Sequence, residues 1–214
     1  MSKIVHVIGN GDQAIRYKPA KGIKLTCNLP PFAVDNVYAT CMVDFKMMKA
    51  ITEGSVTVPG EWVLGFRPKK WTEMRPDFYM KHAPQIKQFY LVVPKYAYDP
   101  QQPDNIGVAY TNFNCGHFAV HYSCAHLKAS EVHMYGFDSL FDPNMRSYTD
   151  TFLTSDRGDT NNFRLTNTWR RVWKGIFDEF PQTKFVLHHK HDKIKISVKE
   201  NVEIYTGKVL YPTS

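Results

Sequence analysis

Short apolar runs recur along the chain and are separated by turn residues, a pattern that predicts a sheet of many short strands. The first run, Lys3–Ile8, ends in Gly9-Asn10-Gly11-Asp12, which is typical of a buried strand followed by a tight turn. The predicted strands are Lys3–Ile8, Ile23–Cys27, Asn36–Val43, Ser55–Val58, Trp62–Phe66, Phe89–Val93, Glu131–Tyr135, Lys184–Leu187, Ile194–Val198 and Val202–Tyr205.

Helical periodicity is clearest in two segments between these strands. Residues Gly116–Lys128 carry small and apolar side chains at helical spacing, and Asn162–Phe180 carries a continuous apolar stripe that ends at Pro181. A shorter helix is expected after Asp44, through Ile51. Because strands and helices alternate, we expect a single α/β domain over residues 1–214, with a mostly parallel sheet and helices on both faces.

Two segments resist regular assignment. Residues Arg67–Lys95 hold seven Lys and Arg against two acidic residues, are interleaved with aromatic residues and are broken by prolines, which favours a basic, aromatic, loop-rich segment. Residues 139–161 are polar and contain turn signals directly after a predicted strand. Long polar loops at the carboxyl ends of strands are often lids, so we interpret 139–161 as a lid-like loop.

Composition and charge narrow the class of protein. The chain has 214 residues, 43% hydrophobic and 22% charged, which excludes disordered and fibrous classes. The formal charge of +7 admits polyanionic partners without naming one. No apolar window long enough to span a bilayer and no signal peptide is evident, so a cytoplasmic location without membrane contact is expected. Four cysteines without C-x-x-C spacing favour buried thiols over a zinc site.

The turn Gly9-Asn10-Gly11 is the strongest candidate for chemistry. Glycines there allow close approach of the backbone, so main-chain N–H groups can face a phosphate. The G-x-G-x-x-G and P-loop fingerprints are absent, and a purely structural strand-end turn is an equally good interpretation. Because carboxyl ends of neighbouring parallel strands meet, we expect Asn10, Asn28 and Asp44 to line one pocket.

Histidines offer a second set of candidates. His117 and His121 have the spacing of metal-binding pairs on a helix, but no glutamate follows His117, so the H-E-x-x-H arrangement is absent and metal binding by this pair is disfavoured. A second cluster comprises His188, His189, His191 and Asp192. We interpret it as a solvated turn, with an acid–base role for one imidazole as the alternative.

Taken in order, three features resemble a known family. They are Gly9-Asn10-Gly11 after the first strand, Cys27-Asn28 after the second, and the helix from Gly116 leading into Glu131–Asp138. This arrangement is similar to the bacterial sialyltransferases of glycosyltransferase family 42 and to related Rossmann-like nucleotide-binding proteins. The chain's compactness resembles small bacteriophage versions of such folds, for which the location would be the host cytoplasm.

The resemblance implies a Rossmann-like domain that binds a nucleotide-sugar as co-substrate, with no other cofactor and no metal ion. Tyr148 matches the lid tyrosines that stabilise the leaving phosphate. The α-helix beginning at Gly116 would direct its N-terminal amides at the nucleotide. The residues implied to contact the nucleotide are Gly9, Asn10, Gly11, Asn28, Gly116, Gly136 and Asp138.

The sequence departs from the family at its catalytic base, because the expected histidine has no counterpart in residues 156–162. We expect Asp156 or Asp159 to deprotonate the acceptor hydroxyl in its place. If the acceptor is DNA with a hydroxylated base, basic residues would bind phosphates and Trp71 or Tyr79 would stack on an exposed base; a solubilising surface with half-buried rings is an equally good interpretation. The candidates for that surface are Arg67, Lys69, Lys70, Trp71 and Arg75.

Three function classes follow from these features. The leading hypothesis is a nucleotide-sugar-dependent glycosyltransferase that transfers a sugar to an acceptor hydroxyl, with modified DNA as one candidate acceptor. The second is a nucleotide pyrophosphokinase or hydrolase, which would need magnesium held by carboxylates such as Asp44 and Asp138. The third is a non-catalytic protein that binds nucleotides or nucleic acid, favoured by the missing histidine base.

Overall fold

The structure is a computed structural model that describes residues 1–141, 153 and 162–207. Its centre is one sheet of eight strands, all parallel, in the order β5-β4-β3-β2-β1-β6-β7-β8. The strands are β1 (Ile4–Ile8), β2 (Ile23–Cys27), β3 (Ala39–Met42), β4 (Trp62–Leu64), β5 (Ile86–Phe89), β6 (Glu131–Tyr135), β7 (Lys184–His188) and β8 (Val202–Tyr205). The predicted Rossmann-like α/β fold is therefore confirmed.

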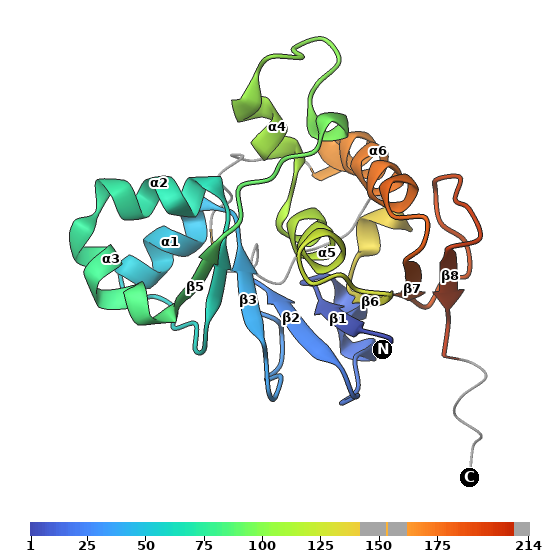
Figure 1. Cartoon of the computed structure of the whole chain (residues 1–214), viewed down its shortest axis with the longest axis horizontal. Coiled ribbons are helices and arrows are strands. Elements are labelled where there is room, and N and C mark those ends of the chain that lie inside the picture. Colours follow the sequence, from blue (N-terminus) through green and yellow to red (C-terminus); the bar gives the residue numbers. More distant parts are fainter. Residues whose placement is uncertain (142–152, 154–161, 208–214) are drawn as a thin grey trace.

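Helices connect the strands, as parallel pairing requires. The α-helices are α1 (Phe45–Thr52), α2 (Phe66–Met74), α3 (Pro76–His82), α4 (Ile106–Asn112), α5 (Cys115–Ala125) and α6 (Asn162–Glu179). Short 3-10 turns are η1 (Asp12–Arg16), η2 (Ala83–Gln85), η3 (Lys95–Ala97) and η4 (Asp138–Leu140). Figure 1 shows α4, α5 and α6 together above the middle of the sheet, and α1, α2 and α3 grouped beside β5. Within the described residues, no helix is both long and apolar enough to cross a membrane.

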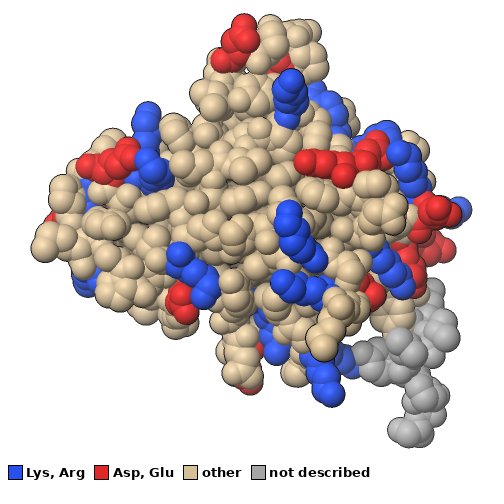
Figure 2. All heavy atoms as spheres, in the orientation of Figure 1, with Lys and Arg blue, Asp and Glu red and all other residues tan. Residues whose placement is uncertain are grey.

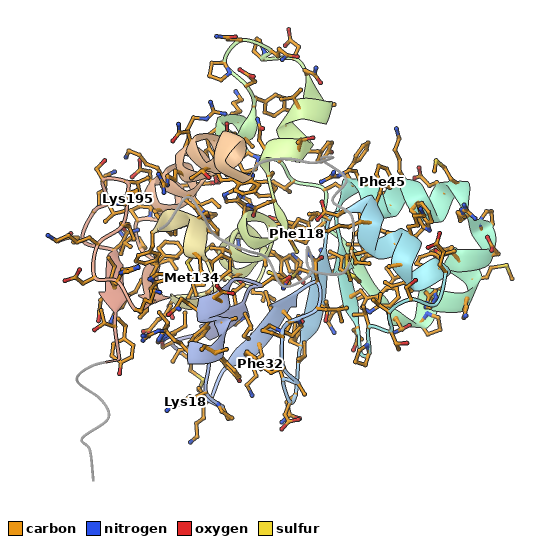
Figure 3. The ribbon with its side chains drawn as sticks, turned by 180° about the vertical axis from the view of Figure 1, so that it is seen from behind. Lys18, Phe32, Phe45, Phe118, Met134 and Lys195 are labelled. Atoms are coloured by element: carbon orange, nitrogen blue, oxygen red, sulfur yellow. The ribbon has the colours of Figure 1, made fainter. Side chains whose placement is uncertain are left out.

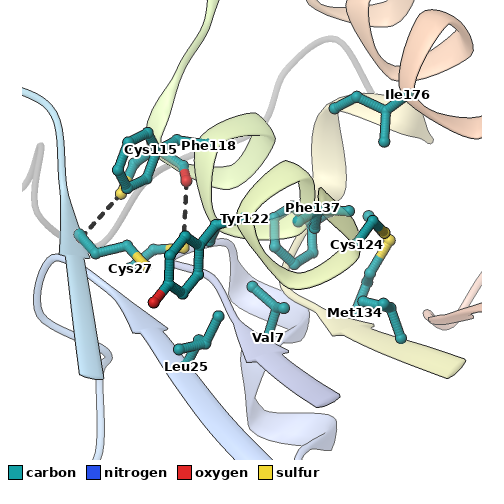
Figure 4. Close-up of a cluster of buried hydrophobic side chains, with 14 of the residues drawn as sticks. Val7, Leu25, Cys27, Cys115, Phe118, Tyr122, Cys124, Met134, Phe137 and Ile176 are labelled. Atoms are coloured by element: carbon teal, nitrogen blue, oxygen red, sulfur yellow. Dashed lines mark hydrogen bonds between the residues drawn. The ribbon is translucent and has the colours of Figure 1, made fainter. Parts of the chain in front are cut away.

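One face of the sheet is sealed by α5 and α6. Alternate residues of the central strands, such as Val7, Leu25 and Met134, are almost fully buried there. Figure 4 shows Val7 and Leu25 below Tyr122 of α5, and Met134 below Cys124 of the same helix. The apolar positions of these strands and the stripe of α6 thus build one continuous core.

The opposite face is covered in two separate pieces. Over β3 and β4, Met42, Trp62 and Leu64 pack into a cluster that includes residues of α1, α2 and α3. Near β1 and β6, Ile8 and the η1 turn form a smaller cluster. Between the two pieces, the side chains that alternate with the core residues Leu25, Ala39 and Cys41 include the polar Thr26 and Thr40.

Several predicted elements are wrong in type or position. Ser55–Val58 and Ile194–Val198 are not strands. In the second, Lys195 N–H donates to the Leu140 carbonyl, and Ile194 packs on the main core without entering the sheet. The fifth strand ends at Phe89, where the prediction began it.

The segment Arg67–Lys95 is helical over much of its length, contrary to the loop-rich interpretation. Pro68 lies in the first turn of α2, and Pro76 lies at the start of α3. Proline is tolerated in these positions because N–H groups of the first turn have no partner within the helix. The prediction therefore missed α2 and α3 because it treated each proline as the end of regular structure.

Candidate functional site

The sheet has a topological switch point between β1 and β6, where the chain stops adding strands on one side of β1 and begins to add them on the other. From β1 the strands proceed through β2, β3, β4 and β5 to one edge, whereas β6, β7 and β8 lie on the other side of β1. In open α/β sheets, ligands bind outside the carboxyl ends of the strands at such a switch point. By this rule a ligand crevice is expected at the carboxyl ends of β1, β2 and β6, next to Asn10, Asn28 and Asp138, and we call this region the switch-point crevice.

The turns after β1 and β6 are held against each other. Gly9 N–H donates to the Tyr135 carbonyl at 2.7 Å, and Gly11 N–H donates to the Gly136 carbonyl at 3.0 Å. A Cβ at Gly11 would lie 2.5 Å from that carbonyl oxygen. Glycine is needed here for contact between two loops. The two amides already have main-chain acceptors, so they do not face a phosphate as the sequence suggested.

Asn10 positions its neighbour at the end of β2. Its Nδ2 donates to the carbonyls of Cys27 at 2.6 Å and Leu29 at 3.2 Å, which lie on either side of Asn28. Asn28 has a left-handed backbone with φ of 53° and is 6% exposed. Its buried Oδ1 has no hydrogen-bond partner among the described residues. The structure therefore brings Asn10 and Asn28 together, as expected.

Asp138 provides a buried carboxylate on the other side of β1. Oδ2 accepts a hydrogen bond from Gln13 N–H at 3.3 Å, whereas Oδ1 is buried and has no hydrogen-bond partner in the described part of the chain. His189 Nε2 lies 3.4 Å from Oδ1, and His189 Nδ1 accepts from His191 N–H at 3.0 Å. In a neutral ring this acceptor role leaves the proton on Nε2, directed at Asp138.

His189 was missed as a site residue because its cluster was interpreted as a solvated turn. The ring is only 2% exposed and stacks on Phe141 with 3.7 Å between ring centres. His191 and Asp192, in contrast, are exposed as predicted. A histidine directly after a buried strand, as here after β7, was the signal available in the sequence.

The start of α5 is fixed by packing and by a capping box. Asn114 Oδ1 accepts from His117 N–H, and His117 Nδ1 accepts from Asn114 N–H. A Cβ at Gly116 would lie 2.5 Å from the Phe137 ring, so glycine permits the helix to approach the turn after β6. Figure 4 shows Cys115 Sγ donating to the carbonyl of Cys41 in β3. Burial raises the pKa of the Cys115 thiol well above its usual range, so it is not a nucleophile.

The histidines of α5 belong to the core. His117 Nε2 lies 3.0 Å from the Trp169 carbonyl oxygen of α6. His121 Nδ1 lies 2.8 Å from the Tyr90 hydroxyl, and its Nε2 lies 3.3 Å from Glu179. Burial lowers the pKa of His121. These contacts join α5 to α6 and to the segment after β5, so both histidines have a packing role in the core.

The magnesium hypothesis is not supported by the positions of its carboxylates. Asp44 follows β3, and Asp138 follows β6, so three strand spacings of roughly 4.8 Å separate the strands that carry them. Asp44 forms an ion pair with Arg67 at 2.9 Å, and both side chains are largely buried. The two aspartates therefore do not ligate one ion, and Asp44 does not share the switch-point crevice with Asp138.

The proposed nucleic-acid surface is largely engaged in contacts within the protein. The Trp71 ring is 9% exposed, and its Nε1 donates to Thr52. Arg75 lies 4.9 Å from the centre of that ring, and Lys69 pairs with Glu73. Trp71 is thus a core residue and does not stack on a base. Figure 2 shows basic and acidic side chains interspersed around this view, with an uncharged centre.

The candidates Tyr148, Asp156 and Asp159 lie outside the described residues. Their assignment as phosphate-binding tyrosine and candidate bases stays a prediction. The same holds for nearly all of the segment 139–161 that was interpreted as a lid, of which residues 139–141 and 153 are described.

A cavity of about 450 Å³ lies on the second face of the sheet. Its lining comes from Thr26 in β2, from residues 28–37 between β2 and β3, from Thr40 near the start of β3, and from residues 58–60 before β4. Asn28 belongs to this lining and connects the cavity with the switch-point crevice. Figure 3 labels Phe32, one of the lining residues, on the segment that follows β2.

Thr26 and Thr40 were also missed as site residues. Their hydroxyl oxygens lie 2.8 Å apart, and both side chains line the cavity. Each threonine lies between core residues along its strand. The sequence pattern therefore indicated polar positions on the second face of β2 and of β3. The order of the strands, which places β2 beside β3, was needed to recognise it.

A row of titratable rings occupies the same face nearer β8. His133 Nδ1 and His188 Nε2 lie 2.8 Å apart, and His133 Nε2 lies 2.6 Å from Glu131. Tyr135 stacks on His188. Burial, together with the positive charge that His133 and His6 can carry, lowers the pKa of His188 to about 3.

Comparison of the chain with known protein families, with curated proteins and with solved structures finds no match. The fold and the residues of the switch-point crevice are therefore the features from which a function can be inferred.

Proposed function

We propose that the protein binds a nucleotide in the switch-point crevice and uses a nucleotide-sugar as donor in glycosyl transfer. The observation that carries the proposal is a pair of buried oxygens, Asn28 Oδ1 and Asp138 Oδ1. Asn28 Oδ1 lacks a hydrogen-bond donor among the described residues, whereas Asp138 Oδ1 faces His189 Nε2 at 3.4 Å; the two residues follow the two strands that flank β1. Leaving a buried acceptor such as Asn28 Oδ1 unpaired costs roughly 1–3 kcal/mol, so a ligand with hydroxyl or N–H donors would relieve that cost.

A nucleotide has the chemistry that fits this pair. Its ribose hydroxyls and the N–H groups of its base are both donors, and the nucleoside part of the ligand meets the carboxyl end of the second strand in doubly wound sheets. The sequence resemblance to the sialyltransferases points to the same ligand class. The similarity in order covers the turn after β1, the end of β2, and the helix and strand that lead to Asp138.

Glycosyl transfer would proceed by attack of an acceptor hydroxyl on the anomeric carbon of the sugar. The carbon–oxygen bond to the phosphate breaks, the nucleotide leaves with both bonding electrons, and a carboxylate takes the hydroxyl proton. Asp156 and Asp159 are the proposed bases, and Tyr148 is the proposed donor to the leaving phosphate. Because Arg75 packs on the Trp71 ring, these two residues do not favour DNA over other acceptors, and experiment must identify the acceptor class.

Thermal-shift measurements with CMP, UDP, GDP and ATP test the nucleotide site. We expect at least one to raise the melting temperature, because a ligand present at about 100 times its Kd stabilises by roughly 2.7 kcal/mol. Asp138→Asn should abolish most of that shift, whereas Asp192→Asn, at an exposed turn, should retain it. Absence of any shift with all four nucleotides would overturn the proposal.

A positive nucleotide is then tested for transfer. The labelled nucleotide-sugar is incubated with DNA and, separately, with glycans, and the label is followed into either acceptor. Transfer that disappears in Asp156→Asn or Asp159→Asn identifies the base. An intact donor with every acceptor, despite nucleotide binding, would favour a binding protein over a transferase.

A further inference from the structure

The cavity on the second face fills the gap between the two clusters that cover this side of the sheet. Val58 on one side belongs to the cluster with α1, α2 and α3, while Phe32 and Val34 on the other side pack on Ile8 and η1. Its volume of about 450 Å³ is within the range of roughly 300–1,000 Å³ found for small-molecule pockets. The gap is therefore large enough for an organic ligand.

The floor of the cavity is polar, whereas its walls are apolar. Thr26 and Thr40 share one hydrogen bond between their hydroxyl groups, so one hydroxyl proton of the pair is left to donate elsewhere. Asn28 adds an amide whose Oδ1 is buried without a partner. Three polar side chains, two on neighbouring strands and one directly after β2, thus line the space between Phe32 and Val58.

This combination suits a flat heterocycle better than a sugar or a purely aliphatic molecule. A side-chain amide offers an acceptor beside a donor, which is the arrangement that pairs with the edge of a nucleobase. The faces of a base are apolar enough to lie against Phe32 and Val34. A sugar would leave these apolar walls uncompensated, and an aliphatic ligand would leave Asn28 Oδ1 unpaired.

The cavity and the switch-point crevice are adjacent because Asn28 and Leu29 line the cavity and also lie next to Asn10. Asn10 Nδ2 donates to the carbonyl of Leu29, and the Leu29 side chain lines the cavity. A nucleotide with its phosphate and ribose near Asn10 would therefore meet the cavity on the β2 side of β1.

We propose that this cavity is the base pocket of the nucleotide site, with the base edge bonded to Asn28 and to the Thr26–Thr40 pair. The assignment rests on the proposed function, because it names the part of the same ligand that this cavity would hold.

Isothermal titration calorimetry tests the pocket with AMP, CMP, UMP, GMP and ribose 5-phosphate as probes. We expect at least one nucleotide to bind about tenfold or more tightly than ribose 5-phosphate, since only the nucleotide carries a base. Asn28→Gly should remove about a tenfold factor from that affinity, as expected for one lost hydrogen bond in a buried site. Thr40→Val should weaken the same nucleotide by a smaller factor.

Asn36→Gly is the matched control. Asn36 has a φ of 55°, close to that of Asn28, but is exposed and does not line the cavity. It makes the same chemical change in the same backbone conformation, so nucleotide affinity should be unchanged. Ala33→Trp places a large ring at an exposed lining residue and should block binding without disturbing the core.

The outcomes separate the two proposals. Equal affinities for ribose 5-phosphate and the nucleotides, with no effect of Asn28→Gly or Ala33→Trp, would overturn the base pocket and leave a nucleotide site at the crevice. No binding of any nucleotide would overturn both. Should Asn28→Gly fail to fold, Thr40→Val and Ala33→Trp provide the same comparison.

Discussion

The two faces of the sheet differ in what covers them. On the first face, residues such as Val7 and Leu25 are completely buried under two long helices. On the second face, the same strands present His6, Thr26 and Thr40, and the covering layer is divided by a cavity. The first face carries the larger continuous apolar core, whereas the second face combines a smaller apolar cluster with the polar groups that a ligand would contact.

The largest expected difference is in the cost of truncating an aromatic residue on each face. Phe185 is fully buried on the first face, so Phe185→Ala should destabilise the protein by about 3–5 kcal/mol. Phe32 is half-buried beside the cavity, so Phe32→Ala should cost much less, about 1 kcal/mol. Urea denaturation measures both. Equal losses would mean that the second face is as tightly packed as the first.

The contact between the turns after β1 and β6 should give the next largest effect. A methyl group at Gly11 has no space beside Gly136, so Gly11→Ala should cost about 1–3 kcal/mol. Gly107→Ala is the control, because this glycine lies in α4 and alanine favours helix by about 1 kcal/mol. If Gly11→Ala were neutral in thermal unfolding, the close approach of the two turns would be wrong.

The histidine row predicts that stability falls as the pH is lowered. The folded-state pKa of His188 is about 3, below its unfolded value, so the unfolded chain binds more protons between these values. The stabilisation is complete above about pH 6.5 and decreases below it, by at most about 2 kcal/mol at pH 5. Groups that face the ring are His133, His6, Tyr135, Arg16 and Tyr205.

His188→Phe isolates this contribution from general acid denaturation. Phenylalanine can retain the stacking on Tyr135 but does not titrate. Denaturation curves at pH 7 and pH 5 should therefore show a smaller loss of stability for the variant than for the wild-type protein. If the free energy of unfolding fell equally in both proteins between pH 7 and pH 5, protonation of His188 would not be a cause of the pH dependence.

The smallest expected effect is that of Asn28→Gly on stability. Glycine adopts the left-handed conformation of this residue without strain, and its introduction removes a buried oxygen that has no partner. The change in unfolding free energy should stay within about 1 kcal/mol. A much larger loss would show that the Asn28 side chain holds the fold and is not kept for a ligand.

The parallel sheet and the long helices could be predicted from the sequence because their signals are local. Buried strands such as Ile23–Cys27 are short apolar runs, and α6 has a regular stripe. The prediction failed where proline was taken as a break, at Pro68 and Pro76, although both occupy first helical turns. It also failed at Ile194, whose burial comes from packing on the core and not from a place in the sheet.

The candidate site was only partly predictable because its geometry depends on pairing between distant strands. The approach of Asn10 to Asn28 followed from the order of parallel strands, and it is found in the structure. The sequence did not predict that the Gly9 and Gly11 amides donate to carbonyls at the end of β6 and in the turn after it, because β6 lies more than 120 residues further along the chain. The contact of His189 with Asp138 depends on the same long-range pairing.

The central claim is that a nucleotide occupies the crevice between Asn28 and Asp138. Amide chemical-shift mapping by NMR during titration with the best nucleotide from the thermal-shift panel tests it most directly. We predict that the largest shifts fall at Asn10, Asn28 and Gly136, and that the amides of Gly54 and Gly107 stay unchanged. Largest shifts on α2 and α3, or none at saturating nucleotide, would contradict the claim.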